Sequence, residues 1–306
     1  KFKSRGLISG QVLLLGISLA TMYSAFADIL PHDDLMAQLR SLESTSATHI
    51  GVYAMNSANN QKLEFNAEKR FPFCSTAKFI TVAAILKNSE SNPDYLQQQI
   101  KFTHYDVQTS GYSPITANHV TNGMTIAELS FAALAYSDNT AMNLLIASLG
   151  GITQVNNYAR TLNDSRFRLD RPEPRLNTAI PHDLRDTTTP QAMGQDIQQL
   201  LLGNALNATS RDKLAKWMIA NTTGAKRIRA GVPQGWAVAE KTGSGDYGTA
   251  NDIGVIYPNK CKPLVMSIYT TSDKKEAKYQ DEVVAKVTKL VLQELAKTDQ
   301  CLKNSL

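Results

Sequence analysis

Strand-like runs lie near both ends of this chain, and mainly helical patterns separate them. Runs rich in apolar and β-branched residues occur at 49–55, 62–66, 236–242, 249–257 and 264–270. Strands at both ends with helices between them predict one antiparallel sheet assembled from both termini, with an all-helical insertion. A cleft between these two parts is the natural place for a functional site.

Helical periodicity covers much of the remaining chain. One face of an opening helix carries Leu35, Leu39 and Leu42, and a closing helix carries Val283, Val284, Val287, Val291 and Leu295. Further helices are expected at 75–87, 125–136, 139–149 and 189–202. The last of these should have Thr189 as its N-cap and Pro190 in its first turn. Residues 160–188 hold three prolines and many charges, which favours a long loop.

The first 27 residues have the pattern of a secretory signal peptide. Lys1, Lys3 and Arg5 precede an acid-free, mostly apolar run at 7–22, and a small-x-small triplet ends at Ala27. Cleavage after Ala27 would release residues 28–306 into the periplasm without a stable membrane anchor; an uncleaved anchor is the alternative. Removing this segment lowers the net charge from +5 to +2, with 29 Lys and Arg against 27 Asp and Glu. That balance argues against nucleic acid as a partner.

Neither the three cysteines nor the five histidines are spaced as metal ligands, so we expect no metal and no cofactor. A last helix that runs back along the strand at 264–270 would return residue 301 close to residue 261. We therefore expect a disulfide between Cys261 and Cys301, with Cys74 buried and free. Two unpaired surface thiols at 261 and 301 are the alternative.

The segment Ser75-Thr76-Ala77-Lys78 begins one of the expected helices and is the first candidate for chemistry. Residues three apart share a helix face, so the Lys78 amine can lie beside the Ser75 hydroxyl and take its proton. The spacing alone is a weak signal, because Ser210 with Lys213 and Ser272 with Lys275 repeat it. Two motifs further along the chain distinguish Ser75.

The first of these motifs is Ser137-Asp138-Asn139, which lies between two expected helices. Its hydroxyl and carboxamide could face a cleft, and helix capping is the structural alternative. The second is Lys241-Thr242-Gly243, which ends an expected strand. Its amine and hydroxyl could hold a carboxylate, and its glycine lets a ligand approach the backbone; a solvated strand end is the alternative.

These three motifs, in this order and spacing, resemble those of the penicillin-recognising serine enzymes. The segments 171–177 (Arg-Pro-Glu-Pro-Arg-Leu-Asn) and 183–188 (Asp-Leu-Arg-Asp-Thr-Thr) are similar to the omega loop of class A β-lactamases. The resemblance covers essentially the whole mature chain. It implies an α/β (α+β) fold, with a five-stranded antiparallel sheet flanked by helices and built from both chain ends. The α/β part would comprise 28–67 and 221–306, and the all-helical subdomain 68–220.

The resemblance also implies the catalytic roles. Ser75 would form an acyl-enzyme, Glu173 would be the general base for the deacylating water, and Asn177 would help to hold that water. The backbone N–H groups of Ser75 and Ser244 would form the oxyanion hole. Ser137 would deliver a proton to the departing lactam nitrogen. Whether Lys78 or Glu173 accepts the serine proton stays open.

Other residues are implied to bind the substrate or to support the loop. Asn139 would clamp the substrate side-chain amide, and the substrate carboxylate would lie on Lys241, Thr242, Gly243 and Ser244. Tyr112 resembles the aromatic wall of the cleft. Arg227 falls where some members carry an extra arginine for the carboxylate, and an exposed charge is the alternative. Arg171 and Asp186 should pair across the neck of the omega loop.

The substrate range follows from finer similarities. The segment 241–246, together with Cys74 before the serine, is similar to the cefotaxime-hydrolysing branch of class A. This implies hydrolysis of penicillins and cephalosporins, oxyimino-cephalosporins included, and hence β-lactam resistance. Gly245 stands where carbapenemases often have a cysteine, which argues against that activity. A monomer is the family default. A penicillin-binding DD-peptidase or a β-lactam sensor is the alternative, although neither explains Glu173 and Asn177.

Overall fold

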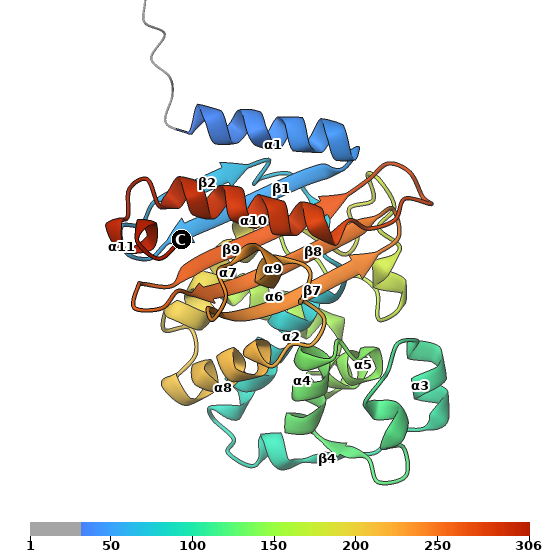
Figure 1. Ribbon diagram of the computed structural model, residues 1–306. Coiled ribbons are helices and arrows are strands. Elements are labelled where there is room, and N and C mark those ends of the chain that lie inside the picture. Colours follow the sequence, from blue (N-terminus) through green and yellow to red (C-terminus); the bar gives the residue numbers. More distant parts are fainter. Residues whose placement is uncertain (1–31) are drawn as a thin grey trace, which may run out of the picture.

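The computed structural model describes residues 32–306 (Figure 1). The expected signal peptide and its cleavage after Ala27 lie outside the described residues. Within the described range, no helix has both the length and the apolar character needed to cross a membrane.

A five-stranded antiparallel sheet forms the centre of the molecule, with the strand order β2-β1-β9-β8-β7. Its strands are β1 (His49–Asn56), β2 (Lys62–Phe65), β7 (Ala237–Gly245), β8 (Thr249–Tyr257) and β9 (Leu264–Thr271). The two ends of the chain meet where β1 pairs with β9, for example at Tyr53 and Ser267. The expected sheet, built from both termini, is therefore confirmed.

Two terminal helices cover one face of the sheet, as Figure 1 shows for α1 (Asp33–Ser46) and α10 (Asp281–Leu295). Leu35, Leu39 and Leu42 of α1 are buried there, as their spacing predicts. They pack in one cluster with the valines of α10 and with the outward face of β1 and β9. The short helix α9 (Ile228–Gly231) packs against α10. The short helix α11 (Gln300–Lys303) follows α10 in the chain.

The opposite face of the sheet is covered by α7 (Pro190–Ile197), which contacts β1, β8 and β9. The Thr189 side chain accepts a hydrogen bond from the Ala192 N–H, so Thr189 is the N-cap and Pro190 the first helical residue, as expected. Gly194 allows the close approach of helix and sheet, because a Cβ there would lie 2.1 Å from the Tyr53 ring. A short π-helical turn, Gln198–Leu202, continues α7.

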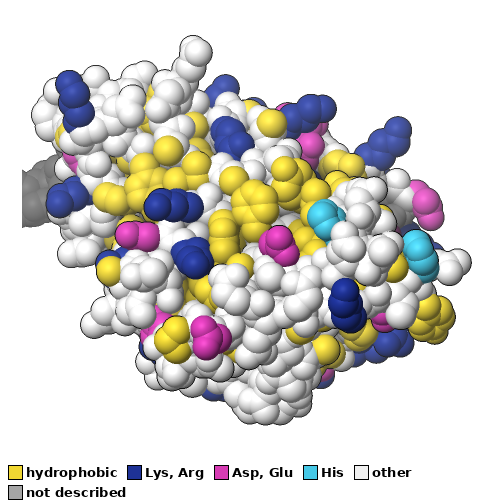
Figure 2. Space-filling view, turned by 90° about the horizontal axis from the view of Figure 1, so that it is seen from below, with side chains coloured by type: hydrophobic (Ala, Val, Ile, Leu, Met, Phe, Trp, Pro, Cys, Tyr) yellow, Lys and Arg dark blue, Asp and Glu magenta, His cyan; other side chains and the backbone are white. Residues whose placement is uncertain are grey.

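The remaining helices form a layer below the sheet, namely α2 (Ala77–Ser89), α3 (His104–Ser110), α4 (Ile126–Ala135), α5 (Asn139–Ser148), α6 (Ile152–Thr161) and α8 (Ala208–Ile219). The residues of α2 from Ala77 to Leu86 are all buried, so this helix is the axis of the layer. The layer and the sheet share one core, which joins Tyr53 and Met55 to Leu134 and Leu145. Seen from below, the layer shows a band of apolar side chains with scattered charges around it (Figure 2).

Two pairs of short strands and one disulfide link segments outside the main sheet. The two-residue strands β3 (Phe71–Pro72) and β6 (Thr187–Thr188) pair, as do β4 (Gln99–Ile100) and β5 (Met124–Thr125). The loop expected at 160–188 is confirmed over 162–186, because α6 runs to Thr161 and Thr187–Thr188 form β6; a 3-10 turn at Arg175–Asn177 interrupts it. Cys261 and Cys301 form the expected disulfide, and Cys74 is buried and free.

Candidate active site

Ser75 lies in a 3-10 turn, Cys74–Thr76, directly before α2. The turn begins with Cys74 at a φ of +50°, a backbone conformation that non-glycine residues adopt rarely. Strand β7 passes close by, and a Cβ at Gly243 would lie only 2.6 Å from the Phe73 carbonyl oxygen. Glycine at 243 therefore lets the strand and the serine turn approach each other.

Lys78 is fully buried and faces Ser75 one turn along the helix. Its Nζ donates to Ser75 Oγ at 2.7 Å and to Asn139 Oδ1 at 2.9 Å. It also forms an ion pair with Glu173 Oε1, and neither side chain of this pair is exposed. The predicted neighbours Ser75, Lys78, Asn139 and Glu173 thus lie in one buried network.

Glu173 is held at its side chain and at its backbone. Ser75 Oγ lies 3.4 Å from Glu173 Oε1, and the Asn177 amide donates to Oε2. Asn143 clamps the backbone, since its Oδ1 accepts from the Glu173 N–H at 2.9 Å and its Nδ2 donates to the Glu173 carbonyl at 3.0 Å. Sequence reasoning missed Asn143, although it lies four residues after Asn139 and so on the same face of α5. The buried Asn177 Oδ1 has no hydrogen-bond partner among residues 32–306.

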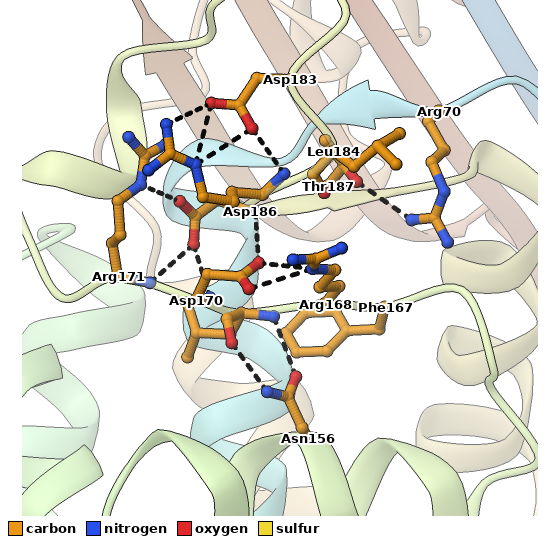
Figure 3. A network of polar contacts seen from close by, with 12 residues as sticks. Arg70, Asn156, Phe167, Arg168, Asp170, Arg171, Asp183, Leu184, Asp186 and Thr187 are labelled. Carbon is orange, nitrogen blue, oxygen red and sulfur yellow. Dashed lines mark hydrogen bonds and ion pairs between the residues drawn. The ribbon is translucent and has the colours of Figure 1, made fainter.

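An ion pair closes the neck of the omega loop, as predicted (Figure 3). Arg171 Nε lies 2.5 Å from Oδ2 of Asp186, whose side chain is 1% exposed. Asp186 Oδ1 also accepts from the N–H groups of Asp170 and Arg171 at 2.8 and 3.0 Å. The Asp186 carbonyl accepts from the Phe73 N–H at 3.1 Å, so the neck is tied to the segment that leads into Ser75.

Across the cleft, Ser137 has a φ of +59°, and Asp138 next to it is fully buried. The Asp138 carboxylate accepts from the N–H groups of Ile115, Thr116 and Ala141. The bond from Ala141 makes Asp138 the N-cap of α5. The capping alternative therefore holds for Asp138. Ser137 and Asn139 on either side of it line the cleft instead.

Lys241 is also fully buried, and its hydrogen-bond acceptors are neutral. Its Nζ donates to Ser137 Oγ at 3.0 Å and to the Thr242 carbonyl at 2.8 Å. Burial, and then the positive charge of Lys78, hold the pKa of Lys241 well below its usual range. The alternative of a solvated lysine is therefore wrong, because β7 continues to Gly245 and keeps Lys241 inside the sheet.

The cleft has a volume of about 460 Å³ and is lined by Ser75, Tyr112, Ser137, Asn139, Asn177, Thr223, Arg227, Thr242, Ser244, Tyr279 and Asp281. Tyr112 is 60% exposed and stands at the rim. Thr223, Tyr279 and Asp281 were not predicted from the sequence, which carries no motif at these positions. The Thr223 hydroxyl bonds that of Thr242.

Arg227 is 4% exposed, so the alternative of an exposed charge is wrong. Its guanidinium donates to the Gly243 and Asn251 carbonyls at 2.8 and 2.7 Å and to Ser244 Oγ at 2.6 Å. Its Nε lies 2.7 Å from Asp281 Oδ1. Of the two cations at this end of the cleft, Arg227 and Lys241, Arg227 is therefore paired with Asp281.

Comparison with known proteins agrees with the fold. The model of the β-lactamase enzyme family matches residues 34–295. The chain is 47% identical to β-lactamase CTX-M-97 of Escherichia coli over 284 residues, which are 93% of this chain and 97% of that protein. It is 47% identical to β-lactamase OXY-1 of Klebsiella oxytoca over 263 residues, 86% of this chain and 90% of that protein. A crystal structure of a β-lactamase from Burkholderia phymatum, 45% identical, matches with a TM-score of 0.83 and covers 86% of this chain and 98% of that one. The chain therefore belongs to the β-lactamase enzyme family, in class A.

Proposed function

We propose that this protein hydrolyses the amide bond of β-lactams through an acyl-enzyme on Ser75, with Glu173 activating the deacylating water. The observation that carries the proposal is the contact of Ser75 Oγ with two groups, Lys78 Nζ at 2.7 Å and Glu173 Oε1 at 3.4 Å. A serine hydroxyl is a weak nucleophile until a neighbouring base takes its proton.

Acylation begins with attack of Ser75 Oγ on the lactam carbonyl. The serine proton passes to Lys78 or Glu173, and the carbonyl oxygen becomes an oxyanion between the N–H groups of Ser75 and Ser244. The C–N bond then breaks, the lactam nitrogen takes the proton of Ser137, and the proton first removed from Ser75 passes on to Ser137, so that Glu173 is a carboxylate again before deacylation. The contact of 3.0 Å between Lys241 Nζ and Ser137 Oγ supports this delivery, because the ammonium stabilises the negative charge that develops on Ser137 Oγ as its proton leaves.

In deacylation a water molecule attacks the ester carbon and loses a proton as it does so. The Glu173 carboxylate accepts that proton and returns it to Ser75 Oγ when the ester C–O bond breaks, and Asn177 Oδ1 helps to orient the water. The Asn143 clamp on the Glu173 backbone and the Asp186 pair at the neck keep the carboxylate in place. This fixed carboxylate separates a hydrolase from an enzyme that stays acylated.

The other end of the cleft binds an anion. Lys241, Thr242, Ser244 and Arg227 converge there, and Lys241 has no anionic hydrogen-bond partner within the protein. A carboxylate adjacent to the lactam nitrogen, as in penicillins and cephalosporins, provides the missing charge. Asn139 would hold the acylamino group at the opposite end, and Tyr112 would form a wall beside it.

We extend the proposal to oxyimino-cephalosporins, penicillins and β-lactam resistance. The similarity to the CTX-M and Toho enzymes supports this range. We also propose that the protein is exported to the periplasm with cleavage after Ala27 and that it acts as a monomer. The proposed α/β part is 28–67 with 221–306, and the all-helical part is 68–220.

Mass spectrometry after mixing with benzylpenicillin or cefotaxime, with the lactam absorbance followed in parallel, tests the proposal. We expect steady loss of absorbance and a transient adduct on Ser75. A Ser75→Ala variant should form no adduct and lose turnover by at least about 10³-fold. A persistent stoichiometric adduct in the unchanged protein would contradict hydrolysis and indicate a DD-peptidase or a sensor.

A further inference from the structure

A second cavity adjoins the carboxylate end of the cleft. It has a volume of about 620 Å³ and lies between α9 and α10, which Figure 1 shows on the same side of β7. Tyr279 and Asp281 line both this cavity and the cleft. These two side chains therefore form a wall that the two cavities share.

The walls of the second cavity are positively charged. Lys226 lies before α9, while Lys286 and Lys289 are three residues apart on α10 and so on the same face. None of the three side chains has a hydrogen bond or an ion pair within residues 32–306. Two carboxylates also line the cavity, but Asp281 is paired with Arg227, which leaves only Glu282 against the three lysines.

Tyr279 provides a flat surface at the entrance. Its side chain is 55% exposed, and the Arg227 guanidinium carbon lies 5.8 Å from the ring centre. The exposed part of the ring is free to stack on a planar group of a ligand. The cavity thus offers an aromatic surface followed by an excess of positive charge.

If the protein binds cephalosporins as proposed above, the position of this cavity indicates which part of the substrate would reach it. In cephalosporins the ring carbon next to the one that carries the carboxylate bears a variable substituent, called the C3 substituent. The acylamino group lies at the far end of the molecule. With the carboxylate on Lys241 and Arg227, the C3 substituent leaves the cleft at that end, where Tyr279 and Asp281 stand.

We propose that the second cavity is a subsite for the C3 substituent of cephalosporins and that it selects planar, anionic substituents. The ring of Tyr279 would stack on a heteroaromatic substituent, and Lys226, Lys286 and Lys289 would attract its negative charge. The attraction between these three lysines and the substituent acts through solvent. It is therefore strongest at low ionic strength.

Three cephalosporins with the same acylamino side chain test this subsite. Cefotaxime has a neutral C3 substituent, ceftriaxone an acidic heteroaromatic one, and cefepime a cationic one. The measured quantity is the ratio of kcat/KM for ceftriaxone to kcat/KM for cefepime. In the triple variant Lys226→Gln/Lys286→Gln/Lys289→Gln we expect this ratio to fall about five- to tenfold at low salt. The difference from the unchanged protein should shrink in about 0.5 M NaCl.

The control variant is Lys62→Gln/Lys262→Gln/Lys303→Gln, which removes the same charge from exposed lysines outside both cavities. Its ratio should match that of the unchanged protein. An equal ratio in all three proteins, or an equal fall in both variants, would overturn the subsite while cefotaxime is still hydrolysed. Absence of cefotaxime hydrolysis in the unchanged protein would instead contradict the proposed function.

Discussion

Two lysines with the same burial have opposite electrostatic surroundings in this cleft. Lys78, at the serine end, is paired with the Glu173 carboxylate. Lys241, at the carboxylate end, donates only to a hydroxyl and a carbonyl, and burial lowers its pKa. The cation at the serine end is therefore paired with a carboxylate before substrate arrives. Lys241, in contrast, has no carboxylate as a hydrogen-bond partner, and Glu173 and Asp252 act on it only through their charges.

The difference teaches how one cleft can serve two tasks. Chemistry at Ser75 needs a carboxylate that is fixed in advance, because activating a water depends on position. Binding needs an unmet charge, because a cation already paired within the protein gains little from a ligand. Most of the following variants alter one end of the cleft and should change the task of that end more than the task of the other.

The largest effect is expected at the serine end. Glu173→Gln keeps the shape of the side chain but removes its ability to accept a proton, so deacylation should fall by at least about 10³-fold. Mass spectrometry during turnover of benzylpenicillin should then show an accumulated adduct on Ser75. Loss of turnover without any adduct would mean that Glu173 is also required for acylation.

Lys241→Ala removes the unmet charge at the carboxylate end. We expect kcat/KM for benzylpenicillin to fall about 10²-fold, because a charge-assisted hydrogen bond to the substrate is lost. The methyl ester of the same penicillin lacks the negative charge and is the matched probe. It should react poorly with the unchanged protein and lose little further in the variant. An equal loss for acid and ester would contradict the assigned role.

Asp186→Asn removes the charge of the neck but keeps a residue that tolerates the φ of +56°. Breaking this buried pair should cost about 3–5 kcal/mol locally and loosen the loop that carries Glu173. Deacylation should slow about 10-fold or more, and acylation less. Single-turnover kinetics separates the two steps. Asp183→Asn, which breaks the more exposed pair with Arg185 on the same loop, is the control and should change neither step appreciably.

The pH dependence of kcat/KM distinguishes the two lysines further. Because the pKa of Lys241 is lowered, its ammonium loses a proton at lower pH than an ordinary lysine does. Affinity for an anionic substrate should therefore fall as pH rises through that pKa. In Lys241→Arg the guanidinium stays charged, so the alkaline fall should move to higher pH by at least about one unit. An unchanged alkaline limb would assign it to another group.

The smallest effect concerns stability directly behind Lys241. Burial, and then the neighbouring Asp252, raise the pKa of Glu240 to about 9 from its ordinary 4.5. The folded chain keeps a proton that the unfolded chain releases, so this contribution to stability is present at low pH and is lost as pH rises toward 9. Glu240→Gln removes this titration together with the 3.0 Å ion pair to Arg229. The Tm of the variant relative to that of the unchanged protein should therefore be a few degrees higher at pH 8–9 than at pH 5. Equal shifts at both pH values would exclude titration as the cause.

Much of the fold could be predicted because its signals are local. The strand runs and the Thr189-Pro190 helix start needed no long-range information. Helix α6 was not identified, because Ile152, Val155 and Ala159 form only a narrow apolar face among polar and β-branched residues. Strand β7 extends beyond Thr242 because its last residues pair with β8, for example Gly245 with Thr249. That pairing is tertiary and leaves little trace in the sequence.

The same distinction holds for the site. Ser75, Lys78, Ser137 and Lys241 stand in short motifs, and the structure brings them together as expected. Asp281 could not be predicted, because its partner Arg227 lies 54 residues away in the sequence. Nor could the burial of Arg227, which depends on two carbonyl groups of β7 and β8.

The pairing of β1 with β9 also determines when this protein can fold. Ribosomes make the chain from its first residue, so β1 emerges long before the strand that completes the sheet. Until β9 is present, β1 has an open edge, and a chain cut short before residue 264 would keep an edge that invites aggregation. A topology that joins the two ends of the chain thus delays folding until synthesis is almost complete.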